Sequence, residues 1–381
     1  MDVSPQNFKQ RIDELKQLQF AGLNERLIKR FLDLSIDYHF DAVNLRELVF
    51  TQQKDAALQL ISGMLGSLAE APARYDLSDF DDEVYRAEKI TKSYGSRSDA
   101  FCLDSCDFSL KKGSITGIVG ENGNGKTTLL RMIAGELSVT TGTASYGRYQ
   151  GWENIKNNIS YIPQRIPKWY GTLQHNMKYY ASIHGVKGKE NQEMVDFYIH
   201  RLGLEKYKDY SWSEISTGYR LRFQLAKIML KHPRLLVLDE PLANLDVNAK
   251  QYFLEDLQDL ARSQANPIAI ILSSQQLHDV EMVSDQIIFL KKGKPEYIGK
   301  VTDIGKDREC NTFELSGNFE LSDLEKLKQI NPAIIIDKKG MTYLLYCPLD
   351  FTSKKLLQAL AQMDFSIDYL RDISNSTKKY F

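Results

Sequence analysis

The chain has 381 residues, of which 43% are hydrophobic and 26% charged, the balance of a globular protein with a substantial core. At ~100–200 residues per domain, this length predicts two or three domains. Lys and Arg total 49 against 50 Asp and Glu, a net charge of −1 that argues against an overall basic field for collecting nucleic acid. We therefore expect no nucleic-acid partner.

The first 84 residues have the apolar spacing of amphipathic helices. The runs Phe8–Leu18, Leu23–Tyr38 and Asp55–Leu68 each place apolar residues at helical intervals. The acidic stretch 71–83, which contains a proline, is typical of a linker. These patterns predict an N-terminal helical accessory domain over residues 1–84, with a role in docking, packing or regulation.

From Val84 onward, short strand-like runs alternate with helical runs. The pairs are Ser114–Val119 before Thr127–Gly135, Leu235–Leu238 before Asn248–Ser263, and Ile268–Leu272 before Leu277–Val283. This alternation predicts an α/β fold in which helices cover a largely parallel sheet. Because the pattern ends near Lys300, we predict one α/β domain over residues 85–300.

The strongest motif is the segment Gly120–Thr128, GENGNGKTT, which fills every position of GxxxxGK[ST] between a predicted strand and a predicted helix. Glycines let such a loop point its N–H groups at phosphate oxygens, and the following helix directs its positive end there. Lys126 would reach the β and γ phosphates, and Thr127 would offer its hydroxyl to Mg²⁺. The motif predicts an ATP and Mg²⁺ site formed by Gly120, Asn122, Gly123, Asn124, Gly125, Lys126, Thr127 and Thr128.

Two carboxylates, Asp239 and Glu240, follow the buried strand Leu235–Leu238. Alone they would fit a solvated turn after a core strand. Behind a phosphate loop they fit the two acidic roles of phosphoryl transfer. We predict that Asp239 holds Mg²⁺ through water and that Glu240 polarises the attacking water.

With these motifs in place, residues 84–300 resemble the ATP-binding cassette (ABC) ATPases, whose further landmarks occur here in the right order. They are Tyr94 in TKSYG, Gln164 in YIPQ, the segment ISTGY at 215–219, and Asp246 in PLANLD. The resemblance implies a P-loop NTPase core with a helical subdomain. It also implies that Tyr94 stacks on adenine, and that Gln164 contacts Mg²⁺ and the attacking water and couples the site to a membrane partner.

In the family, the segment matching ISTGY is the signature and the segment around Asp246 is the D-loop. The resemblance implies that Ser216 and Gly218 bind the γ-phosphate held by another cassette. One chain carries one phosphate loop and one signature, which face away from each other in the family, so two cassettes must pair head to tail. The implied partners are a second copy or a related cassette subunit, and a separate transmembrane permease.

The sequence departs from the family pattern at three positions. Thr217 and Tyr219 replace the usual glycine and glutamine of the signature, and Gln275 stands where the family places a histidine that contacts the γ-phosphate. A glutamine can hydrogen-bond a phosphate oxygen but cannot carry positive charge. We expect a catalytic role for Gln275 with slow hydrolysis, unless His278, one helical turn further on, comes near the site.

Residues 301–381 predict a small α+β accessory domain, with strands at Ala333–Ile336 and Thr342–Tyr346 and a helix at Ser353–Met363. This region resembles the C-terminal domain of drug- and polysaccharide-type export cassettes, with an edge strand near Thr312–Leu315. The resemblance implies support for cassette pairing, and a purely structural role is equally open.

Two aromatic residues, Trp169 and Tyr170, follow Gln164 closely. Aromatic side chains are enriched at interfaces, so we favour a groove that receives a cytoplasmic helix of the permease. Packing within the helical subdomain is the alternative.

The chain is expected to be cytoplasmic. Its first residues lack a basic segment followed by an apolar run, and its most apolar stretch, Pro267–Leu272, is far below the ~20 residues that span a bilayer. The four cysteines form no CxxC pair and are expected to be reduced thiols. A permease would hold the chain at the cytoplasmic face of the membrane.

These observations predict an ATP-hydrolysing subunit that powers a separate permease. Export is favoured over uptake because the signature and the histidine position depart from the strict pattern. The alternatives are a soluble ABC ATPase acting in ribosome, repair or cofactor-assembly work, and a slow nucleotide-dependent regulator. One cassette without a long coiled coil argues against the ribosome and repair classes, and Glu240 argues against the regulator.

Overall fold

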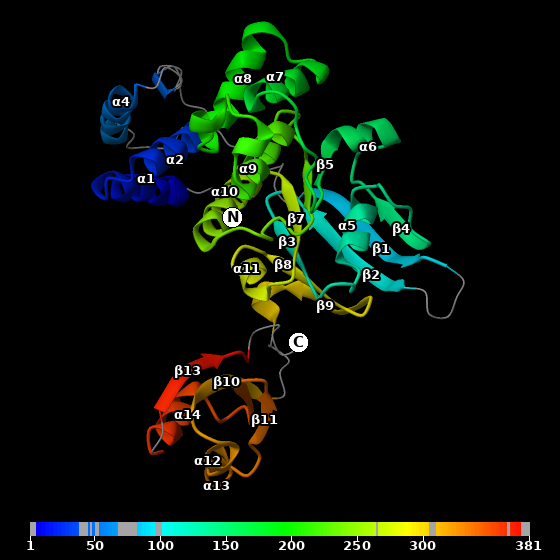
Figure 1. Cartoon of the computed structure of the whole chain (residues 1–381), viewed down its shortest axis with the longest axis vertical. Helices are drawn as coiled ribbons and strands as arrows, with labels where there is room; N and C mark the ends of the chain where they lie inside the picture. The colour runs from blue at the N-terminus through cyan, green and yellow to red at the C-terminus, as the bar shows by residue number, and fades with distance from the viewer. Residues whose placement is uncertain are drawn as a thin grey trace. The chain divides into compact units, whose positions relative to one another are not determined.

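The computed structural model describes residues 5–37, 45, 48–49, 53–67, 82–95, 101–263, 266–304, 310–363 and 366–374. The chain divides into two compact units, Met1–Ile298 and Gly299–Phe381 (Figure 1). The first unit contains both the N-terminal helices and the α/β domain. Their division near residue 84 stays a prediction, because most of the predicted linker lies outside the described residues.

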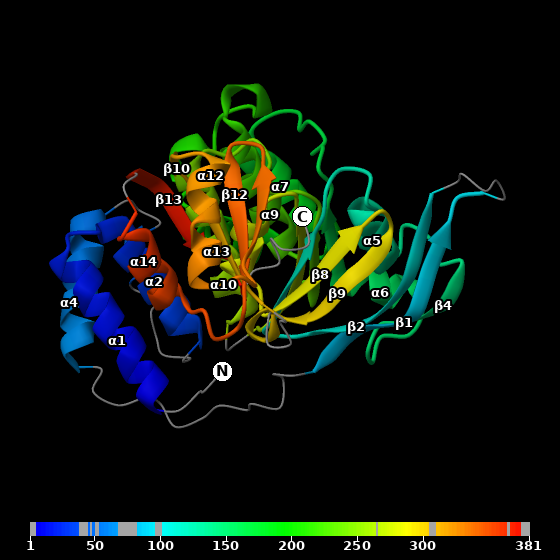
Figure 2. The same cartoon turned by 90° about the horizontal axis from the view of Figure 1, so that it is seen from below.

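Three helices, α1 (Pro5–Phe20), α2 (Asn24–Asp37) and α4 (Lys54–Ser67), confirm the helical prediction for the N-terminal region. The last residues of two predicted runs, Tyr38 and Leu68, lie outside the described residues. Apolar positions at helical spacing give the three helices a small core of their own. It includes Leu15, Leu27, Phe31, Leu32 and Ile61. Figures 1 and 2 both show the helices side by side.

The main sheet has six strands in the order β5-β6-β7-β3-β8-β9. Their bounds are β3 Ile115–Val119, β5 Ile159–Ile162, β6 Leu235–Leu238, β7 Ala269–Ser274, β8 Gln286–Lys291 and β9 Lys294–Lys300. The four pairings from β5 to β8 are parallel, which confirms the predicted parallel sheet. Strands β3, β6 and β7 are buried along their whole length, as their continuous apolar sequences require.

A second sheet of three antiparallel strands, in the order β2-β1-β4, packs beside the first. Its strands are β1 (Glu83–Ser93), β2 (Cys102–Lys111) and β4 (Thr141–Ser145). Their inward side chains share one core with the main sheet and with the helix that follows β3. This sheet places Tyr94, the residue that follows β1, beside the phosphate-loop motif.

Seven α-helices belong to the described part of the α/β domain. They are α5 (Lys126–Ile133), α6 (Trp152–Asn158), α7 (Leu173–Ile183), α8 (Gly188–Arg201), α9 (Thr217–Met229), α10 (Val247–Ala261) and α11 (Leu277–Glu281). Helices α7, α8 and α9 pack on one another as the helical subdomain (Figure 1). Among the described residues, no helix is both long and apolar enough to cross a bilayer.

Trp169 belongs to the core of the helical subdomain. It is 6% exposed, and its ring stacks on Trp212 with centroids 4.9 Å apart and meets Phe223 edge-on. The neighbouring Tyr170 is 82% exposed. The groove prediction is therefore wrong for Trp169, because an indole buried among other aromatics is not available to a partner, and it stays a prediction for Tyr170.

The second unit is a four-stranded antiparallel sheet in the order β11-β12-β10-β13, with three short helices. Its elements are β10 (Asn311–Asn318), α12 (Leu321–Glu325), α13 (Leu327–Ile330), β11 (Ile335–Lys339), β12 (Thr342–Cys347), α14 (Ser353–Leu360) and β13 (Ser366–Asp372). The strand predicted near Thr312–Leu315 exists as β10 but is not at an edge, because β12 and β13 pair with its two sides.

Candidate functional site

The phosphate-loop motif joins the end of β3 to the start of α5. Gly123 and Gly125 have φ angles of 81° and 97°, which residues with a side chain rarely adopt. A Cβ at Gly120 would lie 2.4 Å from the carbonyl oxygen of Leu290, so a side chain is excluded there as well. Lys126 Nζ donates to the carbonyl oxygen of Gly120 at 2.7 Å, so the loop curls around its own lysine.

Asn124 fastens this loop to the neighbouring hairpin. Its Oδ1 accepts a hydrogen bond of 2.8 Å from the N–H of Lys292, in the turn between β8 and β9. Asn124 is buried, whereas Asn122 and Gly123 are exposed at the rim of the loop. The side chain of Asn124 thus maintains the shape of the loop, so Asn124 itself can contact a phosphate only through its backbone N–H.

The two residues predicted to hold Mg²⁺ lie together. Thr127 Oγ1, at the start of α5, donates to Asp239 Oδ2 at 2.8 Å. Both offer oxygen ligands of the kind that Mg²⁺ prefers. Among the described residues there is no group of three or more His, Cys, Asp or Glu that could hold a metal alone. The oxygen pair therefore fits a cation that brings water and phosphate as its other ligands.

Two neighbours of Asp239 were missed by the sequence analysis. Ser273, in β7, donates to Asp239 Oδ1 at 2.9 Å, and the Tyr161 hydroxyl, in β5, donates to Oδ2 at 3.4 Å. Burial raises the pKa of Tyr161 above its usual range, and the charge of Asp239 adds to this rise, so the phenol remains a donor. Both residues come from strands adjacent to β6, a relationship that only the sheet order reveals.

Glu240 occupies a strained position at the centre of the site. Its φ of 46° lies in the left-handed region, which is uncommon for a residue with a side chain. Its N–H donates to Ser273 Oγ at 2.9 Å, which holds the carboxylate in place. Its Oε1 lies 3.2 Å from Lys126 Nζ. The carboxylate predicted to act on water thus lies beside the lysine predicted to bind phosphate.

Both predicted catalytic glutamines reach this carboxylate. Gln164 Nε2 and Gln275 Nε2 each donate to Glu240 Oε2 at 2.8 Å. Gln164 was also predicted as a Mg²⁺ ligand, yet among the described contacts its side chain bonds Glu240 and not Asp239. His278 lies on α11 and makes no side-chain hydrogen bond to a described residue. The structure therefore brings Gln275, rather than His278, into the cluster.

Tyr94 lies at the edge of the phosphate loop. Its hydroxyl is 3.2 Å from Thr128 Oγ1, and the residue is 52% exposed. The ring of Phe101, which precedes β2, lies with its centroid 6.3 Å from that of Tyr94. A Cβ at Gly125 would lie 2.8 Å from the Phe101 ring, so this second aromatic also adjoins the loop. Phe101 was not predicted, because nothing local in the sequence links it to Tyr94.

The signature residues open a helix, as predicted. Ser216 is the N-cap of α9, and its Oγ accepts a hydrogen bond of 3.4 Å from the N–H of Tyr219. Gly218 lies against the D-loop, since a Cβ added there would be 3.5 Å from Leu245 Cδ2. Asp246 is the N-cap of α10 and accepts from the N–H of Ala249 at 2.8 Å.

These three residues form a second, separate cluster. Within the described part of the chain, no hydrogen bond or ion pair joins Ser216, Gly218 or Asp246 to the phosphate loop. Ser216 and Asp246 are exposed at the starts of their helices, where the positive ends of the helix dipoles favour an anion. The structure thus groups the predicted residues into one site around Glu240 and one around the starts of α9 and α10.

Comparisons with known proteins identify related chains. The profile of the family described as "ABC transporter" matches residues 103–243. The ABC transporter ATP-binding protein YhaQ of Bacillus subtilis is 31% identical over 221 residues, which cover 57% of this chain and 71% of YhaQ.

Solved structures show the same fold. The structure of cbiO1 from Clostridium perfringens, described as part of the ABC transporter complex cbiONQ, matches with a TM-score of 0.53 and 21% identity over 66% of this chain and 97% of that chain. A dimer of the ATP-binding cassette MJ0796 bound to ADP and Pi matches with a TM-score of 0.50 and 18% identity, over 57% of this chain and 98% of that one.

Proposed function

This chain belongs to the family of ABC transporter ATP-binding proteins, and on that premise we propose that it hydrolyses ATP to drive a separate membrane permease. The observation that carries the proposal is the cluster of Lys126, Thr127, Asp239 and Glu240 at the carboxyl ends of β3 and β6, two parallel strands that lie on either side of β7. Such an arrangement suits phosphoryl transfer, because it places a cation, a metal-binding oxygen pair and a carboxylate within reach of one phosphate chain.

Each residue of the cluster has a role in the proposed reaction. Lys126 exchanges its contacts with Gly120 and Glu240 for the β and γ phosphates of ATP. Thr127 and Asp239 would hold Mg²⁺, which would supply positive charge to the phosphate oxygens. Release from Lys126 leaves the carboxylate of Glu240 available to accept a hydrogen bond from the attacking water.

Gln164 and Gln275 complete the shell around that water. Both amides already donate to Glu240 Oε2, so each is within one hydrogen bond of the group that would orient the water. Neither can supply the positive charge that the family histidine brings. We therefore propose real but slow hydrolysis at this site.

Head-to-tail pairing would bring the second cluster to the first. Ser216 lies exposed at the start of α9, and a helix N-terminus is a favourable place for a phosphate group. The related cassette MJ0796 is a dimer in its ADP-bound structure, which supports pairing here. The partner would be a second copy of this chain or a related subunit.

The permease is proposed from the family and from cbiO1, whose description places it in a transporter complex. We propose that the permease also holds the chain at the cytoplasmic face of the membrane, and that transport is outward. A slow nucleotide-dependent regulator is the second candidate. One observation favours it: Glu240 has partners on both carboxylate oxygens, which would restrain it from acting on water.

Two variants of the full-length chain test the proposal. Lys126→Ala should abolish ATP binding, measured by equilibrium titration, because it removes the cation from the phosphate site. Glu240→Gln should retain binding and lose hydrolysis by ~10²–10⁴-fold, the usual contribution of a general base. Equal hydrolysis in the Glu240→Gln variant and the unmodified chain would contradict the assigned chemistry.

A further inference from the structure

Helix α2 of the N-terminal region lies against α10, the helix that begins with the D-loop (Figure 1). The two facing surfaces have opposite charge. The basic residues of α2 are Arg26, Lys29 and Arg30, and the acidic residues of α10 are Glu255, Asp256 and Asp259. Their spacings of three and four place each set on one face of its helix.

These residues form a row of ion pairs. Arg26 Nη2 lies 2.8 Å from Glu255 Oε2, Lys29 bonds Asp256, and Arg30 bonds Asp259. The row runs from a partly exposed pair at Arg26 to carboxylates that are almost fully buried at its other end. Burying charged groups is costly unless each is paired, so the two faces are matched to each other.

Asp256 joins three helices at one carboxylate. Its side chain is 0% exposed; Oδ1 accepts from Lys29 of α2, and Oδ2 accepts from Arg222 of α9 at 3.3 Å. Arg222 lies in the second turn of α9, the helix that begins at the signature. The carboxylate therefore connects the N-terminal helix with both helices whose starts form the second cluster.

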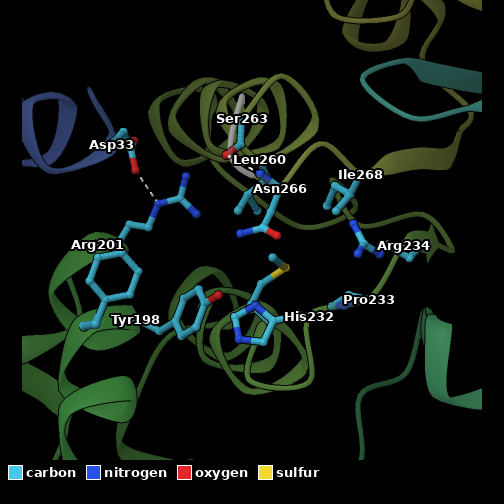
Figure 3. Close-up of a pocket in the computed structure, with 12 residues that line it drawn as sticks. Asp33, Tyr198, Arg201, His232, Pro233, Arg234, Leu260, Ser263, Asn266 and Ile268 are labelled. Carbon is cyan, nitrogen blue, oxygen red and sulfur yellow. Dashed lines mark hydrogen bonds and ion pairs between the residues drawn. The ribbon is translucent and has the colours of Figure 1, made fainter. Parts of the chain in front are cut away.

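A second anchor ties α2 to the helical subdomain. Arg201, the last residue of α8, donates from Nε to Asp33 Oδ1 at 2.5 Å, and both residues are buried (Figure 3). The pair borders a cavity of about 50 Å³ lined also by His232 and Arg234. The cavity is also lined by Met229 and Leu260, from the last turns of α9 and α10, so this pair holds α2 where α8, α9 and α10 end.

We infer that α2 is a clamp that fixes α9 and α10 in the arrangement required for cassette pairing, with Lys29 as its central positioning residue. This inference rests on the proposed function. Lys29 contacts no residue of either cluster directly. It acts through Asp256 on Arg222, and so on the two helices that carry Ser216 and Asp246 at their starts.

The test uses the full-length chain. Its readout is the protein concentration at which the specific ATPase activity reaches half of its maximum. Lys29→Met keeps the aliphatic stem and removes the charge. We expect it to raise that concentration about tenfold, which corresponds to ~1.4 kcal/mol. ATP affinity, and turnover at saturating protein, should remain within about twofold, because the catalytic cluster is untouched.

Three further variants make the result specific. Arg222 contacts Asp256 from α9, so Arg222→Gln should raise the half-maximal protein concentration in the same way. This variant keeps the test informative if Lys29→Met fails to fold. Lys29→Arg should restore the original concentration. Arg26→Met, at the exposed end of the same row, is the matched control and should change it little.

A lower melting temperature with an unchanged half-maximal concentration would overturn the clamp, because it would show a purely structural role. If the unmodified chain itself shows no dependence of specific activity on protein concentration, cassette pairing is refuted and the clamp with it. A shift in Lys29→Met and Arg222→Gln but not in Arg26→Met supports the inference.

Discussion

Gln275 donates a hydrogen bond of 2.8 Å from its side-chain amide to Oε2 of Glu240. A neutral amide thus contacts the carboxylate at the position where related ATPases are expected to carry a histidine. The amide can orient the carboxylate and a water, but it adds no positive charge to the transition state. This contact is the structural basis for the slow hydrolysis that we propose.

Gln275→His should therefore increase the rate of ATP hydrolysis. We expect roughly a tenfold rise in kcat, equivalent to ~1.4 kcal/mol of transition-state stabilisation, with little change in KM. Steady-state hydrolysis at saturating ATP measures it. Gln276→His, one residue further on and bonded to Lys250 instead, is the control. An unchanged or lower rate in Gln275→His would count against the charge argument.

Ser273→Ala should impair catalysis although serine takes no direct part in it. The hydroxyl donates to Asp239 and accepts from the N–H of Glu240, so its loss loosens both acidic groups. Losing a hydrogen bond that orients a metal-binding side chain costs ~10–100-fold in metal affinity or activity. The Mg²⁺ concentration for half-maximal hydrolysis and kcat are the readouts. The hydroxyl of Ser274 accepts a hydrogen bond from the N–H of Gln276 instead. Ser274→Ala should therefore leave the half-maximal Mg²⁺ concentration and kcat near their original values.

Trp169→Ala should destabilise the fold rather than weaken binding of a partner. Removing a buried aromatic side chain costs ~3–5 kcal/mol, and this indole stacks on Trp212 in the core. Tyr170→Ala, at an exposed position, should change the free energy of unfolding by no more than ~0.5 kcal/mol. Urea denaturation measures the free energy of unfolding of both variants. Equally small changes in the two would mean that Trp169 is not a core residue.

Asp259, in the row of ion pairs between α2 and α10, predicts a pH dependence of stability. Burial raises the pKa of Asp259 to about 6, from 3.8, and the charge of Asp33 raises it further, against the opposing charges of Arg30, Lys29 and Arg201. The folded chain therefore binds a proton at Asp259 where the unfolded chain does not. The contribution of this group to stability falls as the pH rises from about 4 to 6.

Asp259→Asn removes this titration. The free energy of unfolding of the variant, minus that of the unmodified chain, should increase between about pH 4 and pH 7, by at most roughly 3 kcal/mol. Urea denaturation across this range measures the difference. Glu255→Gln, in the partly exposed pair of the same row, should show a much flatter profile. A difference that decreases with rising pH would mean that the pKa of Asp259 is lowered instead.

The local parts of the site could be predicted from the sequence. The phosphate loop, Asp239 and Glu240 are set by contiguous residues whose order encodes a strand, a turn and a helix, and the structure places them together. The parallel sheet followed from the alternation of strand-like and helical runs along the chain. For the phosphate loop and the two carboxylates, the physical cause lies in residues that are neighbours along the chain.

The remaining features depend on the order of elements in space. Ser273 and Tyr161 reach Asp239 because β7 and β5 flank β6, which no local pattern states. Trp169 was predicted to be an interface residue because its stacking partner, Trp212, lies more than forty positions later in the chain. The pairing of Lys29 with Asp256 spans 227 positions, so the contact between the N-terminal helices and α10 was beyond sequence reasoning.

The most direct test of the account is Mg²⁺-dependent ATP hydrolysis by the purified chain as a function of protein concentration, with Glu240→Gln as the control. We predict that the rate rises more steeply than in proportion to concentration and disappears in the control, because two cassettes must pair to complete each site. A rate strictly proportional to concentration, or equal activity in the control, would contradict hydrolysis by paired cassettes through Glu240.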